Sequence, residues 1–284
     1  SLGPFVDWVP VCPEVESALD APRESMRLVQ SDGRIRLLTN KTAEDHTGRM
    51  HRYARRRVEE LVDEALVGFV LKKDSPTCGL ERVKVYGAAG MPVKSGRGLF
   101  AHALVTRFSL LPVEEEGRLN DPRLRENFVE RIFAYRRLRA LFTSRWSMGT
   151  VVRFHTAHKL TLMAHMPEAY QRLGRLVASG KSMARREFQD RYSSEFMTAL
   201  QAIATPRRQA NVLQHMLGYF KQALDRGILE QSRLVGRRLD GAHPGSVGVA
   251  FRMSHGQRAR CALSPARETR NSSRSAWKRS GWSR

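Results

Sequence analysis

The sequence predicts an α/β domain built on a parallel sheet, followed by an all-α domain and a basic tail. Residues 66–71, L-V-G-F-V-L, show neither alternation nor helical spacing, which is typical of a strand buried on both faces of a parallel sheet. Beyond residue 120 apolar side chains recur every three or four positions, as in amphipathic helices, and beyond residue 224 this period is lost. We therefore expect an α/β domain at residues 1–119, a helical domain at 120–224 and an irregular basic tail at 225–284, which is either disordered or the product of a shifted reading frame.

Size and hydropathy limit the class of protein. A chain of 284 residues with 41% hydrophobic side chains is long enough for two domains. No apolar stretch is long enough to cross a bilayer, and the first residues lack the basic region and apolar core of a secretion signal. We expect a soluble, cytoplasmic protein, and the sequence does not indicate an oligomeric state.

The net charge of +21 suggests a polyanionic partner such as nucleic acid. Its distribution weakens that interpretation. Residues 225–284 hold 13 basic and 4 acidic side chains, a charge of +9, which leaves 36 basic against 24 acidic, or +12, for residues 1–224. That remainder is spread over helix faces, where solvated charge is the commoner explanation. A basic nucleic-acid-binding or regulatory protein without catalysis remains the alternative function.

Two predicted strands end in turns that contain a cysteine. Residues 5–11 form a short strand that ends at Cys12, and the buried run at 66–71 leads into a polar turn that contains Cys78. Between them an Asp-Gly pair at 32–33 predicts a hairpin, and residues 40–64 predict a helix. A right-handed crossover of this kind sets both cysteine turns at the same edge of the sheet.

This edge is the candidate site, because ligands of open α/β sheets bind outside the carboxyl ends of the strands. The turn that follows residue 71 brings two lysines, a carboxylate, a hydroxyl and the thiol of Cys78 within seven residues. Three cysteines are too few for a disulfide framework, so free thiols are expected. Burial as small hydrophobic side chains would explain Cys12 and Cys78 as well. Cys261 lies in the tail and has no expected structural role.

Two further patterns are weak. The glycine-rich stretch at residues 87–98 leads into a helix and could expose N–H groups to a phosphate, although a flexible loop is the commoner meaning. His155 and His158 lie three apart on a predicted helix at residues 150–163 and could bind a metal. No second motif accompanies them, so packing among helices is the favoured interpretation.

Several separated motifs resemble known families. V-P-V-C-P-E (9–14), P-R-E-S-M-R-L-V (22–29), L-K-K-D-S-P-T-C-G (71–79) and L-P-V-E-E-E-G-R-L (111–119) resemble the thiouracil desulfidase family. F-H-T-A-H-K-L (154–160) and N-V-L-Q-H-M-L-G-Y-F-K (211–221) resemble the helical domain that is fused to it in YbgA-like two-domain bacterial proteins.

The resemblance implies a Rossmann-like domain in which three cysteines hold a [4Fe-4S] cluster, with the fourth iron open to the sulfur of a thiolated pyrimidine base or nucleotide. Cys12 and Cys78 match two of the ligands, and Glu14 and Ser75 match positions around the substrate. Glu14 would activate water or relay a proton, and Ser75 would orient the base.

Two further expectations concern substrate binding and the completeness of the domain. Lys72, Lys73 and Arg23 could attract an anionic substrate. The third cysteine of the family lies in a segment upstream of the strand with which this chain begins. We therefore expect an α/β domain that is incomplete at its N-terminus, without a stable cluster, and thus a partial or inactive copy of the enzyme.

Overall fold

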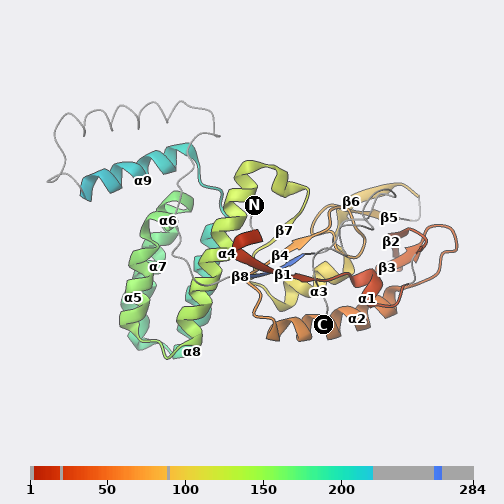
Figure 1. Ribbon diagram of the computed structural model, residues 1–284, viewed down its shortest axis with the longest axis horizontal. Helices are drawn as coiled ribbons and strands as arrows, with labels where there is room; N and C mark the ends of the chain where they lie inside the picture. The colour runs from red at the N-terminus through yellow and green to blue at the C-terminus, as the bar shows by residue number, and fades with distance from the viewer. Residues whose placement is uncertain (1–2, 20–21, 88–89, 220–258, 264–284) are drawn as a thin grey trace.

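The computed structural model describes residues 3–19, 22–87, 90–219 and 259–263. It consists of an α/β part and a helical part that meet along the long helix α4 (Pro122–Thr143), as Figure 1 shows. The predicted combination of an α/β domain with an all-α domain is therefore confirmed. The limits of the domains remain a prediction.

The main sheet has four strands in the order β1-β8-β4-β7, and every neighbouring pair is parallel. Because β1 and β4 run in the same direction, the turns that follow them leave the same edge, as the crossover predicts. The strands are β1 (Val6–Pro10), β8 (Ala259–Leu263), β4 (Gly68–Leu71) and β7 (Val113–Glu115).

Strand β4 is buried along its whole length. Phe69 and Leu71 belong to one hydrophobic core, together with Phe100 of α3 (Leu99–Arg107). Val70 belongs to a separate core on the other side, with Phe128 of α4. Both faces of the strand are therefore covered, which is why its sequence lacks alternation.

A second, smaller sheet has the order β3-β2-β5-β6. The predicted hairpin at Asp32 and Gly33 joins β2 to β3, and both residues have positive φ, +52° and +71°, as a type I′ turn requires. Strand β6 lies in the stretch expected to be a loop, because pairing with β5 satisfies its backbone. The strands are β2 (Met26–Ser31), β3 (Arg34–Thr39), β5 (Val83–Tyr86) and β6 (Pro92–Gly96).

Strand β8 comes from the segment for which the sequence predicts no regular structure. It lies between β1 and β4, with Leu263 opposite both Pro10 and Val70. Two parallel strands set one strand's width apart present unpaired N–H and C=O groups to each other, and a strand inserted between them satisfies both rows. This pairing depends on tertiary contact, so the local composition of the tail does not indicate it. The remainder of the predicted tail lies outside the described residues.

Helix α4 belongs to both parts of the molecule. Phe128 packs on the main sheet, whereas Leu138 lies in the core of the helical part. The Arg139 guanidinium donates to the carbonyl oxygen of Leu66 at 2.7 Å, just before β4. The two parts are therefore joined by shared packing as well as by the chain.

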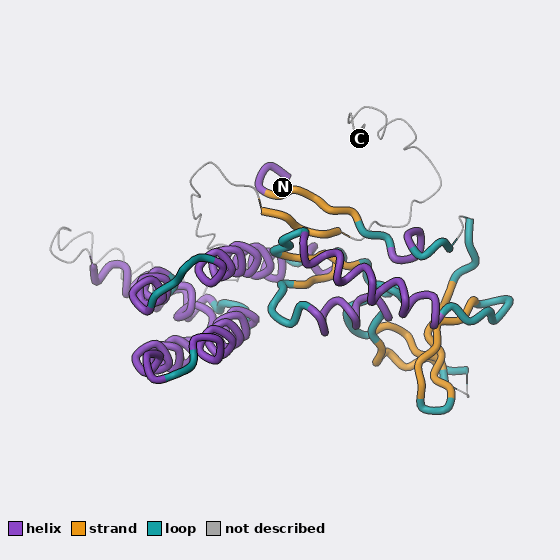
Figure 2. The backbone as a smooth tube through the Cα atoms, turned by 90° about the horizontal axis from the view of Figure 1, so that it is seen from below, coloured by secondary structure: helices purple, strands orange, loops and turns teal. Residues whose placement is uncertain are grey.

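The helices of the helical part that follow α4 pack against one another, and Figure 2 shows them as purple coils. The single helix expected at residues 150–163 is two helices, α5 and α6, which meet at His158. Phe188, Tyr192 and Phe196 stack in the core at centroid distances of 5.8 and 6.0 Å. The helices are α5 (Met148–Ala157), α6 (Lys159–His165), α7 (Pro167–Ser179), α8 (Arg185–Gln201) and α9 (Pro206–Tyr219).

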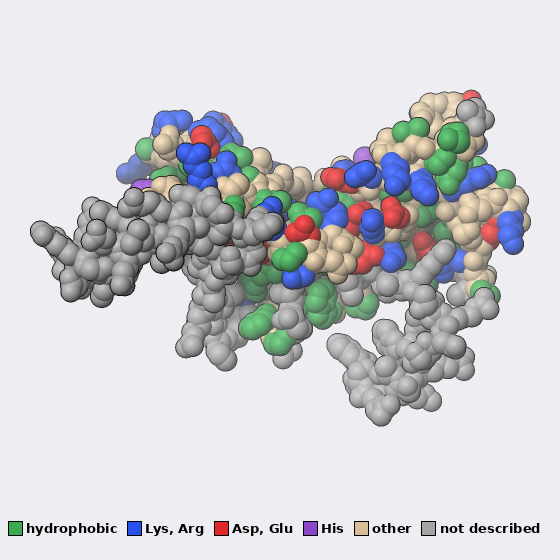
Figure 3. Space-filling model, turned by 90° about the horizontal axis from the view of Figure 1, so that it is seen from above, with side chains coloured by type: hydrophobic (Ala, Val, Ile, Leu, Met, Phe, Trp, Pro, Cys, Tyr) green, Lys and Arg blue, Asp and Glu red, His purple; other side chains and the backbone are tan. Residues whose placement is uncertain are grey.

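The surface carries mixed charge. On the face shown in Figure 3, Lys and Arg side chains alternate with Asp and Glu side chains over the α/β part. Arg107 pairs with Glu59 at 2.8 Å, and Arg118 pairs with Glu114 at 2.7 Å. None of the described helices is long and apolar enough to cross a membrane.

Candidate active site at the carboxyl edge of the sheet

The turn after β1 carries Cys12 and Glu14. Cys12 precedes the short helix α1 (Pro13–Glu16), and its backbone N–H donates to the Glu16 carboxylate at 2.8 Å. The same carboxylate accepts the hydroxyl of Tyr53 of α2 (Thr47–Asp63) at 2.9 Å. Burial and this carboxylate raise the pKa of Tyr53, so its hydroxyl remains a donor. Glu16 therefore anchors the Cys12 turn to α2.

The turn after β4 folds around the side chain of Ser75. Its Oγ accepts the backbone N–H groups of Cys78 at 3.1 Å and of Thr77 at 3.3 Å. The N–H of Gly79 donates to the Ser75 carbonyl oxygen at 2.7 Å. A Cβ at Gly79 would lie 2.3 Å from the Val83 side chain and 2.8 Å from that oxygen, so the turn closes only with glycine. Cys78 is buried, with 3% of its surface exposed.

The amino end of α3 supports this turn from behind. The Leu99 N–H donates to the Pro76 carbonyl oxygen at 3.2 Å, and the N–H groups of Phe100 and Ala101 donate to that of Thr77 at 3.0 and 3.2 Å. These are the helix N–H groups that a phosphate would otherwise accept from. The glycine-rich stretch therefore serves the cysteine turn, and the weak phosphate-binding interpretation does not fit this geometry.

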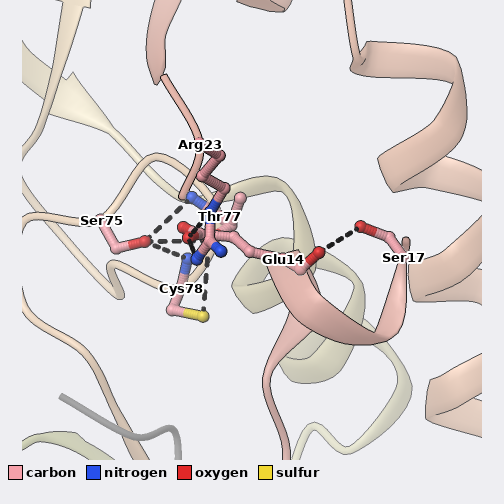
Figure 4. A network of polar contacts seen from close by, with 6 residues as sticks. All are labelled: Glu14, Ser17, Arg23, Ser75, Thr77 and Cys78. Carbon is pink, nitrogen blue, oxygen red and sulfur yellow. Dashed lines mark hydrogen bonds and ion pairs between the residues drawn. The ribbon is translucent and has the colours of Figure 1, made fainter. Parts of the chain in front are cut away.

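Glu14 joins the two turns, as Figure 4 shows. Its Oε2 accepts Nε of Arg23 at 2.9 Å and also Nη2 of the same guanidinium. Its Oε1 accepts the hydroxyl of Thr77 at 3.1 Å. Two N–H groups of one guanidinium hold a carboxylate in a defined orientation. In Glu14 this orientation directs the other oxygen, Oε1, to the Cys78 turn.

Thr77 belongs to this site although no motif or pattern in the sequence singles it out. It is fully buried, and its Oγ1 lies 2.9 Å from Ser75 Oγ and 3.6 Å from Cys78 Sγ. The only sequence signal is a second hydroxyl side chain directly before the cysteine. Of the predicted residues, the structure brings together Glu14, Arg23, Ser75 and Cys78 in one polar network.

The two lysines of the turn lie beside a second carboxylate. Lys72 Nζ pairs with Glu116 at 2.7 Å, and the backbone N–H of Lys73 donates to the same carboxylate at 2.6 Å. Glu115 is buried and accepts the Leu80 N–H at 2.8 Å, and burial raises its pKa. Both carboxylates fix the segment around Cys78. A role of the lysines toward substrate remains a prediction.

The histidines of the helical part pack with aromatic side chains. His155 Nδ1 lies 3.2 Å from the Tyr192 hydroxyl, and its ring stacks on Tyr170 at 5.0 Å. His158 Nδ1 lies 2.8 Å from the Phe154 carbonyl oxygen. Burial lowers the pKa of both histidines. Across the described ranges, no three His, Cys, Asp or Glu side chains form a set that could hold a metal ion.

The thiols at this edge do not complete the ligand set that the resemblance implies. Neither Cys12 nor Cys78 forms a disulfide bond within the described part of the chain. By backbone register Cys261 lies opposite Trp8 and Gly68. Trp8 lies inside β1, whereas Cys12 follows the end of that strand, so the backbone of Cys261 lies within the sheet and short of its carboxyl edge. The described site fits two of three thiolate positions of a [4Fe-4S] cluster.

The fold and the site thus define a two-domain protein whose α/β part gathers two cysteine turns and an Arg-held carboxylate at one sheet edge. Residues 1–116 match the family model described as 2-thiouracil desulfurase, and residues 159–233 match DUF1722, described as a protein of unknown function. By these matches the chain is similar to a 2-thiouracil desulfurase domain followed by a DUF1722 domain.

Two individual proteins are similar to parts of the chain. YbgA of Escherichia coli (strain K12) is 30% identical over 108 residues, which are 38% of this chain and 64% of YbgA. A solved structure of the [4Fe-4S]-dependent thiouracil desulfidase TudS is 26% identical. The match covers 39% of this chain and 68% of that chain, with a TM-score of 0.31.

Proposed function

We propose that the α/β domain removes sulfur from thiolated pyrimidine bases or nucleotides by hydrolysis. The observation that carries this proposal is the network in which Glu14, from the turn after β1, contacts the Cys78 turn through Thr77. The match of residues 1–116 to the 2-thiouracil desulfurase family supports it. In this reaction water replaces sulfur at the ring carbon, so C=S and H₂O become C=O and H₂S.

The roles of the protein's own residues follow from the contacts. Glu14 is the group placed to take a proton from the attacking water, because its carboxylate is held at the edge where Cys78 lies. Arg23 orients Glu14 through its guanidinium and is therefore assigned to positioning. Ser75 shapes the turn by accepting two backbone N–H groups.

The proposed cofactor is a [4Fe-4S] cluster, with Cys12 and Cys78 as two of its ligands. The third thiolate that the resemblance implies is missing from the described side chains, so we propose that this chain carries the site in partial form. The helical domain has no assigned role in the proposed reaction.

Anaerobic reconstitution with iron and sulfide tests the proposal. We expect iron–sulfur absorbance that fades during gel filtration and that persists when excess small thiol supplies the missing ligand. Cys12→Ala and Cys78→Ala should each abolish it, whereas Cys261→Ala should not. In the thiol-supplemented protein, 2-thiouracil should release sulfide. The proposal is contradicted if the protein takes up no iron, or if Cys12→Ala and Cys78→Ala take up as much iron as the unaltered protein.

The alternative function, nucleic-acid binding, predicts a different response. Affinity for a nucleic acid would fall steeply with salt concentration, with a slope set by the number of phosphates contacted. The alternation of basic and acidic side chains in Figure 3 does not favour such a surface on that face. A steep salt dependence in a protein that takes up no iron would support this alternative.

A further inference from the structure

The hydroxyl of Thr77 lies where three polar groups converge (Figure 4). Its Oγ1 lies 2.9 Å from Ser75 Oγ, 3.1 Å from Glu14 Oε1 and 3.6 Å from Cys78 Sγ. A threonine hydroxyl has one proton to donate, so it serves one of these acceptors at a time. Which acceptor it serves depends on its neighbours.

The contacts of Ser75 fix the direction of the hydrogen bonds. Ser75 Oγ already accepts two backbone N–H groups, those of Thr77 and Cys78. Because a hydroxyl oxygen has two lone pairs, its own proton is directed outward, to the oxygen of Thr77. Thr77 then donates to Glu14, since an ionised carboxylate can only accept. The chain of donors runs from Ser75 through Thr77 to Glu14.

Two contacts therefore define the plane of the Glu14 carboxylate. Arg23 occupies Oε2, and Thr77 occupies Oε1. Arg23 belongs to the segment that follows α1, whereas Thr77 belongs to the Cys78 turn. The contact with Thr77 is thus the one that relates the carboxylate to the sulfur of Cys78.

The backbone of Thr77 is held independently of its side chain. Its carbonyl oxygen accepts two N–H groups, from Phe100 and Ala101 at the start of α3. Gly98 lies against the peptide bond between Thr77 and Cys78. A hydroxyl on a backbone held in this way presents a fixed donor, and fixed geometry is what a positioned catalytic group requires.

We infer that Thr77 is a positioning residue that holds the Glu14 carboxylate at a set place relative to Cys78. The part of this inference that concerns catalysis rests on the proposed function, whereas the geometric part rests on the contacts alone. Thr77 itself is assigned no proton transfer with substrate.

The geometric part is tested by crystal structures of variants. Thr77→Val removes the hydroxyl and keeps the shape of the side chain, whereas Thr77→Ser keeps the hydroxyl. Thr39→Val is a matched control, because Thr39 is also buried and its hydroxyl contacts Thr42 and the N–H of Glu44 in the smaller sheet. In Thr77→Val the Glu14 carboxylate should leave contact with the Cys78 turn, and in the other two variants it should stay. An unmoved carboxylate in Thr77→Val overturns the inference.

Kinetics test the catalytic part with the thiol-supplemented protein. For sulfide release from 2-thiouracil, Thr77→Val should lower kcat about ten- to hundredfold with KM unchanged, and Thr77→Ser should restore it. Equal kcat in Thr77→Val and Thr39→Val overturns the inference. If the unaltered protein releases no sulfide, the proposed function fails and the crystal structures still decide the place of Thr77. If Thr77→Val does not fold, Thr77→Ala serves in both measurements.

Discussion

Gly98 lies against the peptide that joins Thr77 to Cys78. A Cβ placed on Gly98 would be 2.4 Å from both the carbonyl carbon and the oxygen of Thr77, and 2.7 Å from the nitrogen of Cys78. The Gly98 N–H also donates to the Gly79 carbonyl oxygen at 2.8 Å. The start of α3 and the cysteine turn are therefore in direct backbone contact.

Gly98→Ala should displace this turn. The clashing atoms belong to the backbone and cannot rotate away, so we expect a loss of about 1–3 kcal/mol in the free energy of unfolding. The buried Cys78 thiol should also react faster with iodoacetamide. Gly87→Ala is the control, because its added Cβ would meet no atom of the described residues within 4 Å. Similar unfolding midpoints in urea for the two variants would count against a close approach at Gly98.

Arg23→Lys separates two roles of this side chain. If Arg23 orients Glu14 through two guanidinium contacts, a lysine cannot replace it, and kcat should fall about tenfold with KM unchanged. If Arg23 binds the substrate, as the sequence analysis suggests, KM should rise instead. Arg36→Lys is the control. Within the described residues, the ion pairs of Arg36 with Asp32 and Asp45 are long, at 3.9 and 4.0 Å.

Asn127→Ala should weaken the link between α4 and α8. Asn127 is buried, and its Nδ2 donates to the Leu200 carbonyl oxygen at 2.9 Å. Without the amide of Asn127, the buried carbonyl group of Leu200 loses this hydrogen bond. We therefore expect the free energy of unfolding in urea to fall by about 1–3 kcal/mol. Asn120→Ala removes an exposed amide that donates to Gly117 at 3.2 Å and should change little. Equal effects of the two variants contradict the prediction.

The helical part should lose stability in acid because of His155 and His158. Burial lowers the pKa of both below the ordinary value of 6.5, so the unfolded chain takes up protons first as the pH falls. The stability that the neutral rings provide is present above 6.5 and is lost as the pH falls through their lowered folded-state pKa values.

Thermal unfolding followed from about pH 8 to about pH 5 checks this prediction. The double variant His155→Phe, His158→Phe should show a shallower decline of Tm than the unaltered protein. His51→Ala, at an exposed position of α2, is the control and should keep the original slope. An unchanged slope in the double variant would show that other groups cause the acid sensitivity.

Much of the fold follows from local patterns. The unbroken apolar run at residues 66–71 predicts a strand covered on both faces, and Phe69 and Val70 lie in different cores. The Asp-Gly pair predicts the hairpin because both positions need positive φ. Other elements depend on partners. Strand β6 pairs with β5, and at His158, where α5 ends and α6 begins, the imidazole ring packs on Phe196 of α8.

The candidate site shows the same division. Cys12, Glu14, Ser75 and Cys78 can be singled out because they follow strands and match family motifs. Thr77 cannot be singled out in this way, because threonine is common in turns. Its role depends on the contact with Glu14, which lies 63 positions away in the chain. The sequence likewise does not indicate that Lys72 is paired with a carboxylate, because its partner Glu116 lies 44 positions further along the chain.

The sequence by itself determined the order of the two domains, the buried strand and the two cysteine turns, because each depends on residues close together in the chain. Only the tertiary structure decided that α3 holds the Cys78 turn, that Thr77 connects this turn to Glu14, and that β8 lies between β1 and β4. Each of these is a contact between backbone or polar groups far apart in the chain. Such contacts leave no periodic pattern, because their geometry exists only once the sheet and its helices have packed.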